Sequence, residues 1–498
     1  MEALRYIHDN LGISYSLILC LVILLALRVI FKARYLPPGP WGFPWLGMVP
    51  YFLLVGRFGG VQRHEALARL AARYGKVFSF TAFGKVIIVL SDPQAVRELF
   101  SRQELNDRPE IHIENIPTGT GVALANGERW KQQRVFTIRI LEKYGVGKPA
   151  FEENIASEAR ALLRELEKLN GEVFNPKHHL MLCVSNIITD ILFSTKHEYD
   201  DADYKNYLDM VAEITHLMGT SGATHSLPLI NLIPLPSRIR LSQILGSEFD
   251  DMHKIIKKHR DRLDRGNLRN FLDEYLNEVV SRREQGSPSE VNDANLPETL
   301  VQLYSAGTEN TATTMRWALL FMIGKLDVQA QVQAELDRVV GRERLPTLSD
   351  EPLLPYTRAT LLEIQRLGSV TPLGVAHFSA SDVPYRSWTI PAQSTVIPNT
   401  WAIHNDPDIW KNPGVFKPGR FLDEKNQIVN DDLIMSFSAG NRICPGRHLA
   451  KMEIFILFTH LMHRFQFRKV GSSPLSFRGH GSFARVPDEF ELQISLRE

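Results

Sequence analysis

The chain has 498 residues, and its 57 Lys and Arg nearly balance its 56 Asp and Glu, which leaves a formal net charge of +1. Hydrophobic residues make up 44% and charged residues 23%, so the composition excludes a disordered chain, and the lack of a basic excess argues against a nucleic-acid-binding protein. The three cysteines, Cys20, Cys183 and Cys444, are too few for an extracellular disulfide scaffold.

The first predicted element is a membrane-spanning helix. Leu11–Leu27 contains seventeen residues without a charge, and the apolar run continues beyond Arg28. About 20 helical residues cross the hydrocarbon core of a bilayer, and the long stem of an arginine can extend to the interface. A cleavable signal peptide is the alternative, but no small-residue cleavage pattern follows the run. We therefore expect an uncleaved N-terminal membrane anchor, residues 1–34.

The charges that flank the anchor predict its orientation. One net negative charge precedes the span, whereas three positive charges follow it, at Arg28, Lys32 and Arg34. Positive residues favour the cytoplasmic side, so we expect a single-pass protein whose remaining chain lies in the cytosol. Residues 35–50, which include Pro37, Pro38 and Pro40, then form a stiff proline-rich hinge.

Residues 51–498 are predicted to form one mainly α domain with a small β-sheet region. Helical periodicity occurs at Val61–Tyr74, Pro93–Phe100, Trp130–Leu141, Phe151–Leu169, Asp201–Met218, Gly246–Arg265, Leu296–Leu326, Val328–Val340 and Pro355–Leu367. Strand-like runs occur at Val77–Phe80, Val86–Leu90 and Trp388–Val396. The polar stretch Gly286–Asn295 is predicted as a surface loop.

The segment Leu296–Leu326 is unusual in its length, because about thirty helical residues span roughly 45 Å. Its middle contains Gly307, Thr308 and Asn310, which are poor helix formers. Two interpretations stay open: a local defect at a functional site, or a glycine that allows close packing against a neighbouring element.

The strongest chemical signal surrounds Cys444. Phe437, Gly440, Arg442 and Gly446 stand at fixed spacings around it, and a helical pattern follows. Glycines let backbone N–H groups approach a sulfur, and a helix start favours negative charge, so the pattern predicts a stabilised thiolate. A zinc or disulfide role is disfavoured because Cys20 lies in the anchor and Cys183 has no ligand pattern nearby.

This pattern resembles the haem-ligand loop F-x-x-G-x-R-x-C-x-G of the cytochrome P-450 superfamily. Two further family motifs precede it in order, E-x-x-R at Glu363–Arg366 and F-x-P-x-R-F at Phe416–Phe421. We interpret a second E-x-x-R copy, Glu335–Arg338, as a solvated helix face. The resemblance implies the cytochrome P-450 fold, a haem-binding catalytic domain over residues 51–498 and haem b with Cys444 as axial ligand of the iron. It also implies a buried network of Glu363, Arg366 and Arg420.

The resemblance further implies which residues bind the two haem propionates. Trp130 and Arg134 match a W-x-x-x-R helix of the family, and Arg442 and His377 stand where the animal microsomal branch places other propionate partners. Arg108 is a further candidate. Buried carboxylates require cationic or N–H donors, which these residues supply.

By the same resemblance the chain is a monooxygenase that inserts one oxygen atom of O2 into a lipophilic substrate, such as a steroid, fatty acid, terpenoid or xenobiotic. Electrons would come from NADPH through cytochrome P-450 reductase, with cytochrome b5 as a second possible donor, at the cytosolic face of the endoplasmic reticulum. Basic residues for a reductase would be Lys131, Arg134, Arg139, Lys143 and Arg447. Family position implies a substrate pocket of Ile113, Leu303, Ala306, Val370, Leu373 and Phe483. The apolar loop Leu227–Leu235 would be a second membrane contact.

The chain departs from the family where an acid is usually followed by an alcohol. Glu309 matches the acid, but Asn310 replaces the alcohol, and Thr311 lies one residue later, about 100° around the helix. These three residues are the catalytic candidates. An amide can still donate a hydrogen bond and hold water. An isomerase that rearranges hydroperoxides without O2 or a reductase is the alternative, and a haem sensor without turnover is a further one.

Overall fold

The structure is a computed structural model that describes residues 35–111, 119–146, 148, 151–225, 235–481 and 483–497. The predicted anchor, Ile113 and all of the apolar loop except Leu235 lie outside these residues. Within the described ranges, no helix has the length and apolar character that crossing a bilayer requires.

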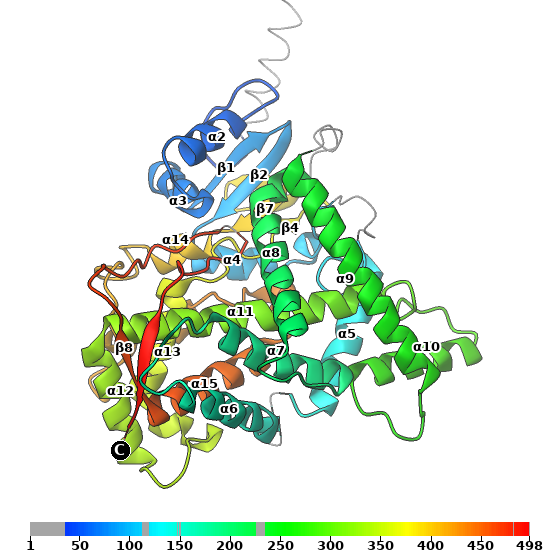
Figure 1. The fold of residues 1–498 in the computed structure, drawn as a ribbon. Coiled ribbons are helices and arrows are strands. Elements are labelled where there is room, and N and C mark those ends of the chain that lie inside the picture. Colours follow the sequence, from blue (N-terminus) through cyan, green and yellow to red (C-terminus); the bar gives the residue numbers. More distant parts are fainter. Residues whose placement is uncertain are drawn as a thin grey trace, which may run out of the picture.

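A small lobe near the N-terminus contains helices α2 (Val49–Arg57) and α3 (Arg63–Tyr74) against a mixed sheet. The sheet has the order β1-β2-β7-β4, with strands at Val77–Ala82, Lys85–Leu90, Thr395–Pro398 and His377–Phe378 for β1, β2, β7 and β4. β2 pairs in parallel with β7, so Val89 lies opposite Ile397, whereas the other two pairings are antiparallel. Chain segments about 300 residues apart are thereby joined (Figure 1).

The predicted strand Trp388–Val396 is wrong as a single element. Its first part, β6 (Trp388–Ile390), forms a hairpin with β5 (Val383–Tyr385). The chain then turns, with Gln393 at φ 64°, and continues into β7 of the main sheet. A third sheet, with the order β3-β9-β8, was not predicted; its strands are Val173–Phe174, Leu492–Leu496 and Phe465–Lys469.

Helices form the rest of the domain, which confirms the mainly α prediction. They are α4 (Pro93–Phe100), α5 (Gly127–Lys143), α6 (Glu152–Glu167), α7 (Lys177–Phe193), α8 (Ala202–His225), α9 (Pro236–Asp261), α10 (Phe271–Glu284), α11 (Leu296–Gly324), α12 (Leu326–Val339), α13 (Pro355–Gly368), α14 (Thr400–His404) and α15 (Arg447–Arg464). Sequence periodicity missed α7 because it is buried around nearly its whole circumference, so it has no polar face. It also missed α10, which begins where the Asn270 side chain accepts a hydrogen bond from the Asp273 N–H.

Helix α11 crosses the middle of the domain (Figure 1) and packs against both α7 and α15. Its helical backbone is continuous from Leu296 to Gly324, so no helical break occurs at Gly307. A Cβ at Gly307 would lie 2.6 Å from Cδ1 of Ile188 on α7. The packing interpretation of this glycine is therefore the one that the structure supports.

Glu335 of α12 is buried, so the prediction of a solvated face is wrong for this residue, although Arg338 is exposed. The Glu335 carboxylate accepts hydrogen bonds from the N–H groups of Tyr356 and Thr357, at 3.0 and 2.8 Å, and from the Thr357 hydroxyl at 2.7 Å. These amides begin α13, whose own N-cap residue, Leu354, supplies no side-chain cap. Glu335 thus caps a neighbouring helix.

We expect Glu335→Ala to lower the free energy of unfolding by about 1–3 kcal/mol, because it leaves buried N–H groups of α13 without acceptors. Urea unfolding followed by far-ultraviolet circular dichroism measures the change. Arg338→Ala, on the exposed side of the same helix, is the matched control and should change stability by less than about 0.5 kcal/mol. Equal effects of the two substitutions would contradict the capping role.

Candidate functional site

The Cys444 loop lies between α4 and the start of α15. The Cys444 N–H donates to the Phe437 carbonyl at 3.0 Å, which closes the loop. Gly440 has φ 71°, and a Cβ there would lie 2.0 Å from the Phe100 carbonyl oxygen of α4. Both the conformation and the contact therefore require glycine. Gly446 precedes the first residue of α15, so the positive end of that helix lies beside Cys444.

The surroundings of Cys444 act on its thiol in two directions. Burial raises the pKa of the thiol, and this effect outweighs the Gly446 N–H and the nearby cations Arg134 and Arg447, which act in the opposite direction. A metal ion bound to the sulfur would favour the thiolate further, because coordination deprotonates a thiol.

A cluster of cations and N–H groups lies near this loop. The Arg442 guanidinium stacks on the Trp130 ring, with 4.0 Å between Cζ and the ring centroid, and donates to the Asn106 carbonyl at 2.6 Å. Arg108 donates to the Val375 and Ala376 carbonyls at 3.0 and 2.9 Å. Arg134 donates to the Ile443 carbonyl at 2.6 Å, next to Cys444.

His377 completes this cluster. Its ring stacks on Phe100 at 3.6 Å, and its Nδ1 lies 2.6 Å from the Leu105 carbonyl, to which it donates. The pKa of His377 is well below its ordinary value, mainly because the ring is buried and also because Arg108 repels a second charge. Its remaining nitrogen, Nε2, therefore carries no proton in this environment unless an anion comes close.

The cluster fits a group that carries negative charges. Among the described residues, no carboxylate forms an ion pair with Arg108, Arg134 or Arg442. The buried Nε1 of Trp130, Nε2 of His377 and Nε of Arg108 also have no hydrogen-bond partner there. Burial and mutual repulsion lower the pKa values of Arg108 and Arg442. Two buried carboxylates, such as the propionates of haem, would accept from Trp130 and Arg108, would favour a proton on His377 Nε2, and would offset these charges.

Glu363, Arg366 and Arg420 lie together, as the resemblance to the cytochrome P-450 superfamily implies. Glu363 and Arg366 are 0% exposed and form two hydrogen bonds, at 2.7 and 2.9 Å. Arg420 donates to the same Glu363 carboxylate at 3.1 Å, and the Lys417 N–H donates to it at 2.8 Å. Arg366 also donates to the carbonyls of His404 and Pro413, at 2.6 and 2.8 Å. Every member of this buried ion network is thereby hydrogen-bonded.

The three catalytic candidates of α11 point in different directions. The Asn310 amide donates to the Ala306 carbonyl at 3.2 Å, on a side of the helix where Ala306 is exposed and Leu303 is half-buried. The Thr311 hydroxyl instead donates to Glu453 of α15 at 3.2 Å. The glutamate Glu309 is buried, its Oε1 accepts from Thr313 at 3.1 Å, and burial raises its pKa. Asn310 alone of the three therefore shares the side of Ala306.

Glu453 is a residue of this region that sequence reasoning missed. It is buried, one of its oxygens has no partner among the described residues, and burial raises its pKa to about 8. Its signal was a single acid directly before the apolar run Ile454–Phe458 of α15. A carboxylic acid at such a position is expected to be protonated at neutral pH.

The pocket candidates divide between two regions. Leu303 and Val370 pack against the main hydrophobic core, whereas Leu373 packs against the core of the small lobe. Val370 is joined to the segment of Phe483 by a hydrogen bond from the Arg485 N–H to the Val370 carbonyl at 2.7 Å. Phe483 itself is exposed.

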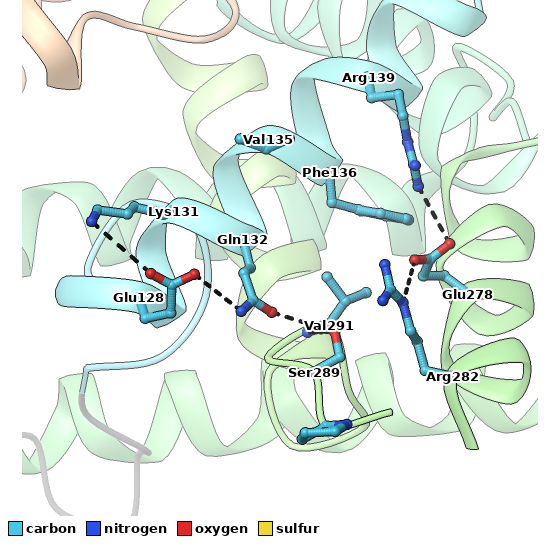
Figure 2. A pocket seen from close by; sticks show the side chains of 11 residues that line it. Glu128, Lys131, Gln132, Val135, Phe136, Arg139, Glu278, Arg282, Ser289 and Val291 are labelled. Atoms are coloured by element: carbon cyan, nitrogen blue, oxygen red, sulfur yellow. Dashed lines mark hydrogen bonds and ion pairs between the residues drawn. The ribbon is translucent and has the colours of Figure 1, made fainter. Parts of the chain in front are cut away.

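The basic residues of α5 do not form one continuous patch. Figure 2 shows a hollow of about 380 Å³ between α5 and α10, with Val135 and Phe136 on one side. There Arg139 pairs with Glu278 at 3.3 Å, and Glu278 also binds Arg282. Lys143 pairs with Glu274 of α10. The α10 acids thus neutralise the end of α5 that lies away from Cys444.

Comparison with known proteins is consistent with this geometry. A family model for cytochrome P450 matches residues 37–494. Rat cytochrome P450 2U1 is 34% identical over 490 residues, which cover 94% of this chain and 92% of the relative. Cytochrome P450 18a1 of Drosophila melanogaster is 32% identical, covering 94% of this chain and 88% of its own. Mouse cytochrome P450 2J5 is 33% identical, covering 96% and 95%.

We expect Glu363→Gln to lower the free energy of unfolding by about 3–5 kcal/mol, because it leaves two buried arginines without a counter-charge. Urea unfolding measures the effect. Glu424→Gln removes an exposed acid from the segment that follows Arg420 and serves as the control, with an expected change below about 0.5 kcal/mol. A loss of less than about 1 kcal/mol in Glu363→Gln would show that the network tolerates a missing charge.

Proposed function

We propose that this chain, which belongs to the cytochrome P450 family of haem-thiolate monooxygenases, inserts one oxygen atom of O2 into a lipophilic substrate with electrons from NADPH. Cys444 would be the axial ligand of the haem iron, and Trp130, Arg134, His377 and Arg442 would hold the propionates, with Arg108 beside them. The observation that carries this proposal is the buried donor cluster beside Cys444, whose arginines form no ion pair with a carboxylate among the described residues.

When bound, the haem supplies oxygen activation, and a thiolate ligand favours cleavage of the O–O bond. The chain's own residues would deliver protons and exclude bulk water. Asn310, on the side of Ala306, can donate a hydrogen bond and hold a water molecule. Glu309 is near enough to Lys177 and Arg316 to be influenced by their charges. It would move protons from that side of the domain toward Asn310.

Thr311 has a different proposed role from the alcohol that family members carry here. Its hydroxyl donates to Glu453 and thereby joins α11 to α15, the helix that follows the Cys444 loop. We therefore assign proton delivery to Glu309 and Asn310, and assign to Thr311 the coupling of α11 to α15.

An exposed apolar surface supports membrane attachment at the endoplasmic reticulum. Trp41, Phe43, Leu53, Leu54 and Phe58 are each more than half exposed, and Phe58 reaches 78%. These residues lie on α2 or directly before or after it, at one end of the molecule (Figure 1). Tryptophan and phenylalanine favour the membrane interface. The surface follows the apolar run Leu11–Leu27 in the chain, so one bilayer could bind both.

The reductase would bind near Arg134 and Arg447, the cations closest to Cys444. Lys131 belongs to the same end of α5, where it pairs loosely with Glu128 at 4.0 Å. Arg139 and Lys143 are already paired with α10 acids and would contribute less to steering an acidic partner. Cytochrome b5, which is another electron donor of microsomal membranes, would bind the same face.

Labelled O2 tests the proposed reaction. The holoenzyme is incubated with NADPH, a microsomal reductase and a panel of lipophilic compounds, and product mass is measured. We expect one labelled oxygen atom in a product that requires NADPH. A parallel incubation with lipid hydroperoxides but no reductase tests the isomerase alternative. Rearranged hydroperoxide, with no NADPH-dependent label in any product, would overturn the monooxygenase proposal.

Asn310→Thr tests the proton-delivery role. We expect roughly two- to tenfold more product per NADPH consumed, because a hydroxyl can both donate and accept in a proton relay. Asn310→Ala is the matched variant that removes the amide without adding a hydroxyl, and its coupling should fall. Identical coupling in both variants and in the parent would show that the residue at 310 does not limit proton delivery.

A further inference from the structure

His404 at the end of α14 has two roles, one for its main chain and one for its ring. Its carbonyl accepts from Arg366 at 2.6 Å, which joins it to the buried ion network. Its ring is 0% exposed and makes a hydrogen bond at each nitrogen. The Nε2 atom lies 3.0 Å from the Met435 backbone nitrogen, and Nδ1 lies 2.9 Å from the Ser369 hydroxyl.

The partners determine which ring nitrogen carries the proton. Burial and the neighbouring Arg366 guanidinium lower the pKa of His404 to about 3, so the ring is neutral at neutral pH. The Met435 N–H can only donate, so Nε2 must accept and Nδ1 must carry the proton. Nδ1–H then donates to Ser369, whose hydroxyl donates to the Arg366 carbonyl at 2.6 Å. The hydrogen bonds therefore run in one direction, from Met435 through the ring to α13.

Met435 begins the turn that leads into the Cys444 loop. Its carbonyl accepts from the Ser438 N–H at 3.0 Å, and Ser438 has φ 62°, which a non-glycine residue rarely adopts. Phe437, between them, accepts the hydrogen bond from the Cys444 N–H. A backbone in such a conformation persists only where its surroundings hold it. The bond between His404 and Met435 is one of the contacts that hold it.

We propose that His404 is a positioning residue of the Cys444 loop. The Nε2 of His404 accepts from the Met435 N–H and thereby sets the position of the Cys444 sulfur toward the haem iron. This inference rests on ligation of the iron by Cys444, as proposed above. The Glu363–Arg366 pair then has two roles. The pair stabilises the protein, and through His404 the pair is connected to the Cys444 loop.

Two substitutions separate the two ring nitrogens. His404→Gln places an amide oxygen near the position of Nε2, so it can still accept from Met435. His404→Asn is shorter and places its amide near Nδ1, so it keeps only the contact with Ser369. Ser369→Ala removes the partner of Nδ1 and leaves the Met435 bond in place.

The readout is the Soret spectrum of the reduced carbonyl complex of the holoenzyme, which distinguishes thiolate from thiol ligation. We expect His404→Asn to convert to the thiol-ligated form about tenfold faster than the parent enzyme, because the Met435 N–H is left buried without an acceptor. His404→Gln and Ser369→Ala should each stay within about twofold of the parent rate. Hydrogen exchange of the peptide that contains Met435 should rise in His404→Asn alone.

His460→Asn is the matched control. His460 is 2% exposed, its Nε2 bonds the Pro346 carbonyl at 2.9 Å, and it lies near the far end of α15 from the Cys444 loop. The same substitution there removes a comparable buried hydrogen bond, so general destabilisation would affect both variants alike. We expect His460→Asn to keep the thiolate spectrum.

Three results would overturn the proposal: a stable thiolate spectrum in His404→Asn, its loss in His404→Gln, or equal loss in His460→Asn. If His404→Asn yields no holoenzyme, His404→Gln decides the question. A parent-like spectrum and parent-like hydrogen exchange at Met435 in His404→Gln support the role of His404, and loss of both excludes that role. A parent enzyme that lacks the thiolate spectrum would instead contradict the assignment of Cys444.

Discussion

The buried pair of Glu363 and Arg366 is the interaction on which the region around the Cys444 loop depends. Two ions that are fully removed from water are costly unless each remaining donor and acceptor is satisfied. That requirement brings separate segments together: the Arg420 side chain, the Lys417 N–H and the carbonyls of His404 and Pro413. The pair therefore determines the path of the chain before the Cys444 loop, as well as contributing to stability.

The family resemblance implied this network, and the order of the motifs selected its residues, but local sequence was not enough to predict its supports. Glu363 and Glu335 stand in the same four-residue pattern, and only the position relative to Phe416–Phe421 distinguishes them. Glu335 looks like a surface acid of an amphipathic helix, yet it is buried because α13 begins against it without a cap of its own. Such a contact depends on the packing of two helices, which no local pattern records.

Helix α11 shows the same division between what spacing predicts and what packing decides. One residue corresponds to about 100° of rotation, so Asn310 and Thr311 were expected to point in different directions. The sequence does not say which of these directions faces the site. It also does not show that Glu453 accepts a hydrogen bond from the Thr311 hydroxyl, because that contact depends on the packing of α11 against α15. The helical period of α7 was not visible at all, because a helix that is apolar on every side has no alternation to detect.

The electrostatics at Cys444 combine features that the sequence shows with one that only the fold determines. Glycines, a helix start and arginines near Cys444 are favourable features in the sequence, but burial has the larger effect on the thiol pKa and depends on the fold. The arginines and His377 have the complementary problem, since burial gathers positive charge and N–H donors that form no ion pair with an acid among the described residues. A dianionic group that contains a metal cation offsets both costs at once. Its affinity for the native state alone would stabilise that state, so binding of the cofactor and stability of this region are coupled.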